Sequence, residues 1–280
     1  MLGILAGGGP LPGRVAAAAL ATGRDVFVLG FEGFADPVVL APYPHEFVRL
    51  GAAGRIRDLL SAHACRDLVL VGVLRRPSVL DLRPDAFGVR VLGRIGRATF
   101  AGDDSILTAI VRVLQEEGFV VRGVEEVLRD ILAPAGLLTH AAPDAMAFAD
   151  IARGVHVVRA LGVVDVGQGS VVQQGIVLAV EAAEGTDAML TRAATLARSG
   201  PGGVLVKLVK PGQDRRTDLP TLGPETVRLA AAAGLRGIAF EADGTLLVER
   251  EKMVAVAEAA GLFLVGLDPA NLAAMAQGER

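Results

Sequence analysis

Short apolar runs alternate with amphipathic segments along the first 130 residues of the chain. Runs of four to six residues that predict buried strands occur at Gly3–Ala6, Val26–Gly30, Leu68–Val73 and Phe119–Arg122. Segments with apolar residues at helical spacing occur at Leu11–Thr22, Arg55–Ala62, Ile106–Glu117 and Glu125–Ile131. Strands that alternate with helices in this way are typical of a parallel sheet with helices packed on it.

The pattern is interrupted between residues 132 and 143, where Pro134, Gly136 and Pro143 predict a linker. Beyond it, strands are predicted at Ile176–Glu181, Val204–Val209, Gly237–Glu241, Thr245–Val248 and Phe263–Leu267. Helices are predicted at Asp144–Leu161, Asp187–Ala197, Thr226–Ala233 and Glu251–Ala260. We therefore expect two α/β domains with a cleft between them, residues 1–133 with a Rossmann-like parallel sheet and residues 134–280.

Composition narrows the class of protein. The chain has 280 residues, 52% of them apolar and 21% charged, which is typical of a folded protein with a large core. A net charge of −3 argues against nucleic-acid binding, which depends on many basic contacts to phosphates. One cysteine excludes a disulfide framework, and four scattered histidines without a cysteine cluster exclude an ordinary zinc site.

No apolar run approaches the roughly 20 residues of a membrane span, and the N-terminus lacks the basic region of a signal peptide. We therefore expect a soluble, cytoplasmic protein.

The first predicted strand runs into Gly7-Gly8-Gly9, and a helix follows. Glycines at such a turn allow a ligand to approach backbone N–H groups, and the start of the helix favours phosphate. The spacing is neither the dinucleotide fingerprint nor a P-loop, because prolines follow and no Gly-Lys-Ser/Thr is present. Two interpretations remain open: a tight turn without a ligand, or a contact with a phosphate or sugar.

Polar residues of the second half are concentrated in four segments, at 165–169, 181–189, 207–211 and 213–221. Thr186 and Asp187 follow a predicted strand at its carboxyl end, where open α/β sheets bind ligands, although capping of the next helix is the alternative. Lys207 and Lys210 lie three positions apart on one predicted strand. Positions three apart on a strand face opposite sides, so both lysines can reach one site only if the chain bends at Pro211. The alternative is that each is a solvated lysine at the edge of the sheet.

The segment from Gln213 to Thr221 is too polar to pack in a core. Its basic groups suit a pyrophosphate, and its carboxylates suit Mg²⁺ or the positioning of a water molecule. A solvated loop with exposed ion pairs is the alternative. In the first half, Asp103 precedes a predicted helix and either caps it or faces the cleft. Arg76 follows a buried strand, where a basic residue suits a substrate phosphate.

Five segments, spread over almost the whole chain, together resemble the LpxI family of UDP-2,3-diacylglucosamine pyrophosphatases. The matching segments are Gly3–Pro12, Gly102–Asp104, Asp165–Gly169, Glu184–Met189 and Lys210–Gly223. The most specific signal is Glu-Gly-Thr-Asp-Ala-Met at 184–189 combined with Lys-Pro-x-Gln-Asp-x-Arg-x-Asp-Leu-Pro-Thr at 210–221. The glycine-rich start alone would not identify a family.

The resemblance implies an enzyme of lipid A biosynthesis. Members of this family hydrolyse the pyrophosphate of UDP-2,3-diacylglucosamine to UMP and 2,3-diacylglucosamine 1-phosphate. The resemblance further implies Mg²⁺ dependence, attack of water on the phosphorus attached to the sugar, and two domains that enclose the lipid. It implies that Asp218, in Asp-Leu-Pro-Thr, is required for turnover.

Such a hydrolysis needs neutralisation of phosphate charge and an oriented water. The residues that we predict to be catalytic are Asp218, Asp187, Lys210 and Arg216. The predicted ligands of Mg²⁺ are Asp218 and Asp214. The predicted substrate contacts are Gly9, Leu11, Pro12, Arg76, Asp103, Gln168, Thr186, Lys207, Gln213 and Thr221.

Two other functions are compatible with parts of the sequence. A non-catalytic nucleotide-sugar sensor would use the glycine-rich turn without turnover, and an NAD(P)-dependent oxidoreductase is disfavoured by the missing fingerprint. Contact with the inner membrane is implied only by the lipid nature of the substrate. The sequence leaves the oligomeric state open, with a homodimer as one option.

Overall fold

The computed structural model describes residues 1–74, 82–96, 103–212, 214–270 and 272. The chain forms two compact units. The first consists of Met1–Arg129 together with Asp214–Asp218, and the second of Asp130–Gln213 and Leu219–Arg280. The short segment 214–218 thus groups with the unit formed by the N-terminal part of the chain.

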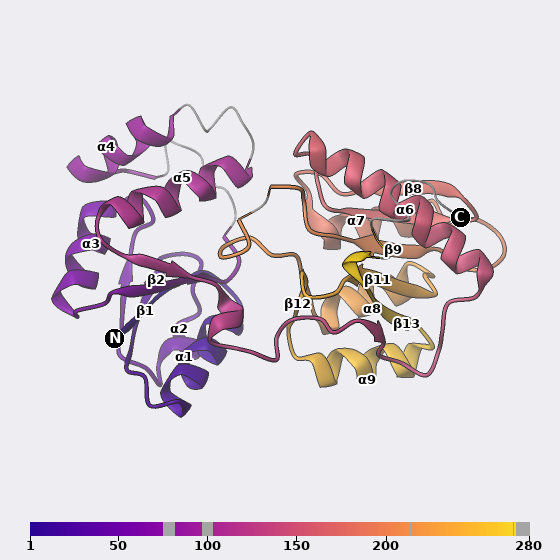
Figure 1. Ribbon diagram of the computed structural model, residues 1–280, viewed down its shortest axis with the longest axis horizontal. Coiled ribbons are helices and arrows are strands. Elements are labelled where there is room, and N and C mark those ends of the chain that lie inside the picture. Colours follow the sequence, from indigo (N-terminus) through magenta and orange to yellow (C-terminus); the bar gives the residue numbers. More distant parts are fainter. Residues whose placement is uncertain (75–81, 97–102, 213, 271, 273–280) are drawn as a thin grey trace. The chain divides into compact units, whose positions relative to one another are not determined.

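The first unit has a five-stranded parallel sheet, as the sequence predicts. Its strands, in the spatial order β3-β2-β1-β4-β5, are β3 (His45–Val48), β2 (Val26–Phe31), β1 (Leu2–Ala6), β4 (Asp67–Val71) and β5 (Val120–Arg122). The helices are α1 (Leu11–Ala21), α2 (Pro37–Leu40), α3 (Ala53–Ala62), α4 (Ala86–Ile95) and α5 (Asp103–Glu116). Helices α1 and α2 lie on one side of the sheet, and α3, α4 and α5 lie on the other (Figure 1). Central strands covered on both faces explain the uninterrupted apolar runs.

The second unit has a six-stranded mixed sheet in the order β6-β13-β11-β9-β7-β8. Its strands are β6 (Gly136–Leu137), β13 (Phe263–Leu267), β11 (Gly237–Glu241), β9 (Val204–Lys207), β7 (Gly169–Gln173) and β8 (Ile176–Val180). A separate pair is formed by β10 (Thr221–Leu222) and β12 (Leu246–Leu247). Strands β13, β11 and β9 are parallel, whereas β7 runs antiparallel to both β9 and β8.

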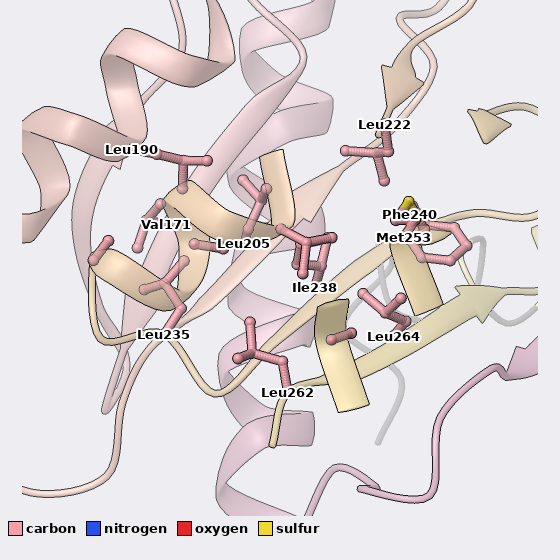
Figure 2. Close-up of a cluster of buried hydrophobic side chains, with 14 of the residues drawn as sticks. Val171, Leu190, Leu205, Leu222, Leu235, Ile238, Phe240, Met253, Leu262 and Leu264 are labelled. Carbon is pink, nitrogen blue, oxygen red and sulfur yellow. The ribbon is translucent and has the colours of Figure 1, made fainter. Parts of the chain in front are cut away.

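Alternate residues of the second sheet pack on opposite layers of helices. The helices are α6 (Ala145–Val163), α7 (Gly185–Ala194), α8 (Pro224–Ala232) and α9 (Arg250–Ala260). Leu205 packs with residues of α7, α8 and α9 in the cluster shown in Figure 2, while Val204 and Val206 pack against α6. This alternation is the period of two expected of a strand. Among the described residues, no helix has the length and apolar character needed to cross a membrane.

Several local predictions need correction. The predicted linker contains β6, which pairs with β13, and β7 lies in a segment for which no strand was predicted. The predicted helix 125–131 is a single 3-10 turn, Val124–Glu126. Helix α5 begins at Asp103, so that this residue is part of the helix and does not precede it. Strand β9 ends at Lys207, so that Lys210 lies beyond the strand.

Candidate functional site

Polar residues gather at one edge of the second sheet. Strands β8, β9 and β11 run in the same direction. Strands β9 and β11 end at Lys207 and Glu241, and Glu181 directly follows β8. Strand β7 runs the opposite way, so its first residue, Gly169, lies at the same edge. The carboxyl ends of strands in open α/β sheets are where ligands bind.

Lys207, Thr186 and Glu181 form a buried hydrogen-bonded group at this edge. The Lys207 ammonium donates to Thr186 Oγ1 at 2.5 Å, and the Thr186 hydroxyl donates to Glu181 Oε1 at 2.8 Å. Lys207 Nζ lies 3.9 Å from Glu181 Oε1. Helix α7 receives no side-chain cap, so the hydroxyl of Thr186 serves Glu181 and is not a helix cap. The sequence predicted Lys207 and Thr186 as site residues, whereas Glu181 was noted only as the end of a strand and the start of a polar segment.

Lys210 binds a different partner. Its ammonium donates to Asp165 Oδ1 at 3.0 Å, and both side chains are largely shielded from solvent. Asp165 has a φ of 53°, a left-handed conformation that aspartate tolerates better than most residues. The two lysines thus form separate ion pairs, and they do so because the chain leaves the strand after Lys207.

Arg159 and Glu241 hold the backbone between the two lysines. The Arg159 guanidinium donates to the Val209 carbonyl at 3.1 Å and to Glu241 Oε2 at 3.2 Å. The Val209 N–H donates to the same carboxylate oxygen at 3.3 Å. Neither Arg159 nor Glu241 was singled out from the sequence, because one lies mid-helix and the other ends an apolar strand. Together they set where the chain leaves the sheet before Lys210.

Asp187 lies in the first turn of α7 and is exposed. The Thr226 hydroxyl, at the start of α8, lies 3.5 Å from its Oδ1. Thr221 is also exposed and donates its hydroxyl to the Leu219 carbonyl at 3.3 Å. Gln168 contributes a backbone carbonyl that accepts the Leu208 N–H at 3.0 Å. Gln168 and Asp187 therefore lie on segments that adjoin the sheet edge, whereas Thr221 belongs to the separate pair of β10 and β12.

The segment 214–218 contains a tight internal ion pair. Arg216 donates through Nε to Asp214 Oδ1 at 2.9 Å and through its terminal nitrogen to Asp214 Oδ2 at 2.6 Å. The hydrogen bonds from Arg216 lower the pKa of Asp214 despite partial burial of the carboxylate. Asp218 is half-buried, and its backbone N–H donates to the Asp214 carbonyl at 3.1 Å. No described residue donates a hydrogen bond to the Asp218 carboxylate.

These contacts bear on the predicted metal ligands. Both oxygens of Asp214 are bound by Arg216, so Asp214 does not join Asp218 in a two-carboxylate site in this structure. The described residues contain no group of three or more His, Cys, Asp or Glu placed to hold a metal ion. A magnesium ion that is bound mainly by substrate phosphates needs as few as one protein carboxylate. Asp218 and Asp214 thus remain predicted ligands, and in this structure the carboxylate of Asp214 is bound by Arg216.

The glycine turn of the first unit lies at a reversal of strand order. Strands β1 and β4 are neighbours whose chains continue to opposite edges of the sheet, the arrangement at which doubly wound folds bind ligands. Gly7 donates its N–H to the Val71 carbonyl at 2.8 Å, and Gly9 has a φ of 89°. A shallow pocket of about 250 Å³ is lined by Gly8, Gly9, Gly33, Phe34 and Val73. Leu11 and Pro12 are buried in the first turn of α1, so their side chains belong to the core.

Three of the predicted contacts are not placed. Arg76 and Gln213 lie outside the described residues, and Asp103 begins α5 but its side chain is not described.

Comparison with known proteins gives matches over both halves. A family model described as the LpxI N-terminal domain matches residues 1–131, and one described as the LpxI C-terminal domain matches residues 134–265. The UDP-2,3-diacylglucosamine pyrophosphatase LpxI of Caulobacter vibrioides is 43% identical over 274 residues, which cover 96% of this chain and 98% of that protein. Among solved structures, the UDP-glucose 4-epimerase of Thermus thermophilus in complex with NAD covers 100% of the chain at 17% identity. The match covers 93% of the epimerase chain, and its TM-score is 0.33, below the level that indicates a shared fold. Since both domain families match in order and a relative aligns over nearly its full length, the chain belongs to the LpxI family.

Proposed function

We propose that the protein hydrolyses the pyrophosphate bond of UDP-2,3-diacylglucosamine to UMP and 2,3-diacylglucosamine 1-phosphate. The observation that carries the proposal is the 43% identity over 96% of the chain to a protein named for this activity. The polar edge of the second sheet supports it, because cationic and anionic side chains are gathered there within an otherwise apolar unit.

Hydrolysis of a pyrophosphate needs little covalent participation by the protein. It requires donors for the phosphoryl oxygens and a group that orients water toward phosphorus. Lys210 and Arg216 carry the cations that would bind the phosphoryl groups, and each is held by a carboxylate. Asp218, whose carboxylate accepts no hydrogen bond from a described residue, would orient the attacking water. Asp187 is the second carboxylate to which we assign a catalytic role. A bound Mg²⁺ would supply further neutralisation of phosphate charge, and Asp218 would be its ligand from this chain.

Asp218→Ala tests the proposal directly. The variant should release UMP from UDP-2,3-diacylglucosamine on the order of 10² to 10³ times more slowly than the wild type, as expected for removal of one preorganised polar group. Asp218→Asn keeps the size of the side chain and serves as the matched variant, with circular dichroism to verify folding. Wild-type turnover in a folded Asp218→Ala protein would refute the role of this residue. Binding of the substrate by the wild type without release of UMP would instead indicate a sensor.

The proposed substrate carries two acyl chains, and these make it poorly soluble in water and favour its residence in a membrane. We therefore also propose transient contact of the protein with the cytoplasmic face of the inner membrane. Co-sedimentation with vesicles of phosphatidylglycerol and phosphatidylethanolamine measures this contact, and recovery of all protein in the supernatant would contradict it.

A further inference from the structure

Glu181, Gly169 and Lys207 form one row across three neighbouring strands. Glu181 continues the pairing of β8 with β7 by donating its N–H to the Gly169 carbonyl at 2.9 Å, and Gly169 pairs with Lys207 of β9. Lys207 lies two residues beyond Leu205, whose side chain faces α7–α9 (Figure 2), and therefore faces the same layer. Because the middle residue of the row has no side chain, the carboxylate and the ammonium reach toward each other across it.

The glycines of segment 165–169 leave the space that Glu181 occupies. A Cβ atom at Gly169 would lie 2.6 Å from Glu181 Oε2, and one at Gly167 would lie 2.0 Å from the Glu181 carbonyl oxygen. A side chain at either position would displace Glu181. The glycines at 167 and 169 are thus explained by Glu181, twelve positions after Gly169.

Stability alone does not account for this arrangement. The exposed fractions are 7% for Glu181, 9% for Thr186 and 5% for Lys207, so a full charge pair is removed from water. Glu181 Oε2 is buried without a hydrogen-bond partner among the described residues. Burial of ions with an unsatisfied oxygen is costly, and well-packed apolar residues would be as stable or more so. Thr186 lies next to Asp187 in the first turn of α7, so the group joins that turn to the end of β9.

We propose that Glu181 is a positioning residue of the enzyme. Through the Thr186 hydroxyl it fixes the first turn of α7, which carries Asp187, and it sets the place of the Lys207 ammonium at the sheet edge. This inference rests on the proposed hydrolase function. Glu181 touches no reacting atom in this assignment, and its effect passes through Thr186 and Lys207.

Steady-state kinetics of Glu181→Gln test the proposal. This variant keeps the shape of the side chain but removes its charge. We expect kcat to fall by about 10- to 100-fold, as for loss of one hydrogen bond to a charged group, while KM is unchanged. Glu251→Gln, on the exposed face of α9, is the matched control and should keep wild-type kcat. Thr186→Ser retains the hydroxyl and should retain activity, whereas Thr186→Val should lose it as Glu181→Gln does. If Glu181→Gln does not fold, Thr186→Ser and Thr186→Val test the same hydrogen bond from its other end.

A readout that needs no activity is available because the chain has only three lysines, Lys207, Lys210 and Lys252. Reductive methylation followed by mass spectrometry reports each separately. In the wild type Lys252, whose side chain is 59% exposed, should react fast and Lys207 slowly. In Glu181→Gln the rate at Lys207 should rise relative to Lys252.

The two measurements separate the possible failures. Wild-type protein that releases no UMP, yet protects Lys207 in a manner that depends on Glu181, overturns the hydrolase function and leaves the buried group intact. A folded Glu181→Gln protein with wild-type kcat and unchanged protection of Lys207 overturns the positioning role. Loss of activity in Thr186→Ser equal to that in Thr186→Val overturns the part assigned to the hydroxyl.

Discussion

Asp214 and Arg216 are two residues apart, yet they bind each other through both carboxylate oxygens. The Arg216 N–H adds a further hydrogen bond to Asp214 Oδ1 at 3.0 Å. The pair closes a turn whose next residues are Thr217 and Asp218, and the backbone N–H groups of both donate to the Asp214 carbonyl. At the scale of single residues, Asp214 therefore stabilises the turn that leads to Asp218.

The pair makes a prediction about acid stability. Arg216 lowers the pKa of Asp214 from its ordinary value of 3.8, so the carboxylate stabilises the folded state above that value and loses this effect as the pH falls through its lower folded pKa. Urea unfolding of the wild type and Asp214→Asn should therefore differ most at neutral pH, with the wild type more stable. The difference should shrink as the pH falls below 3.8. A difference that stays constant from neutral pH into this range would show that the ion pair does not form.

Helices α3 and α4 begin at a shared carboxylate. Asp85 Oδ1 accepts the Gly88 N–H at 2.6 Å and so caps α4, while Oδ2 accepts the Gly54 N–H at 2.8 Å in the first turn of α3. Burial raises the pKa of Asp85, but the backbone N–H groups of Gly88, Arg55 and Gly54 outweigh this and lower it. At the scale of elements, one residue thus satisfies donors of two helices that would otherwise be left without partners.

Asp85→Ala should therefore destabilise the first unit by roughly 1 to 2 kcal/mol, the usual range for loss of a helix cap. The free energy of unfolding from urea denaturation measures the loss. Asp58→Ala, on the exposed side of α3, is the control and should change stability by less than about 0.5 kcal/mol. Equal stability of the two variants would mean that the double cap contributes nothing.

A second prediction at this scale concerns the chain after β9. Arg159 of α6 and Glu241 of β11 bind the backbone of Val209 from both sides, one residue before Lys210. Glu241→Gln weakens the two bonds that this carboxylate accepts, from Arg159 and from the Val209 N–H, without changing the shape of the side chain. UMP release should therefore fall while α6 and β11 stay folded. Kinetics combined with circular dichroism test this. Wild-type turnover in Glu241→Gln would indicate that Lys210 is held by Asp165 alone.

At the scale of the whole molecule, each unit has its own apolar core, and the ion pairs of Lys207 and Lys210 are local groups within the second unit. The described residues offer no preformed cage for a metal ion. A metal that enters mainly with substrate phosphates would be held weakly by the protein itself and would be easy to remove.

Chelation tests this expectation. Dialysis against EDTA should abolish UMP release, and added Mg²⁺ should restore it fully without any refolding step, because no protein cage has to be rebuilt. The thermal midpoint of the wild type should not change on chelation. A large drop in that midpoint would indicate a structural metal, and undiminished turnover in EDTA would exclude a metal requirement.

Much of the fold was predictable from the printed sequence. Continuous apolar runs identified β1, β2 and β4, since strands covered on both faces carry no polar alternation. Glycines after β1 located the turn at the reversal of strand order. Motifs that resemble one family pointed to Thr186, Lys210 and the segment with Asp218, and that family is the one to which the chain belongs. Lys207 was singled out as a polar residue on a predicted apolar strand.

Other features depend on partners that are distant in the sequence. Strand β7, Gly-Ser-Val-Val-Gln, has only two apolar side chains, too few to predict a central strand from the sequence. Its pairing with β8 and β9 defines it. Strand β6 has two residues and exists because β13 lies beside it. From the sequence, Glu181 and Glu241 are the last residues of predicted strands, and Arg159 lies within a predicted helix. Their contacts depend on residues far away in the chain.

The physical reason is the range of the interactions concerned. Hydrophobic periodicity and turn chemistry are properties of neighbouring residues, so the sequence by itself determined which segments are buried and where the chain turns. Which strands become neighbours is decided by pairing across long stretches of chain. Only that pairing brings the carboxylate of Glu181 over Gly169 to the ammonium of Lys207, and so only the tertiary structure shows the buried group.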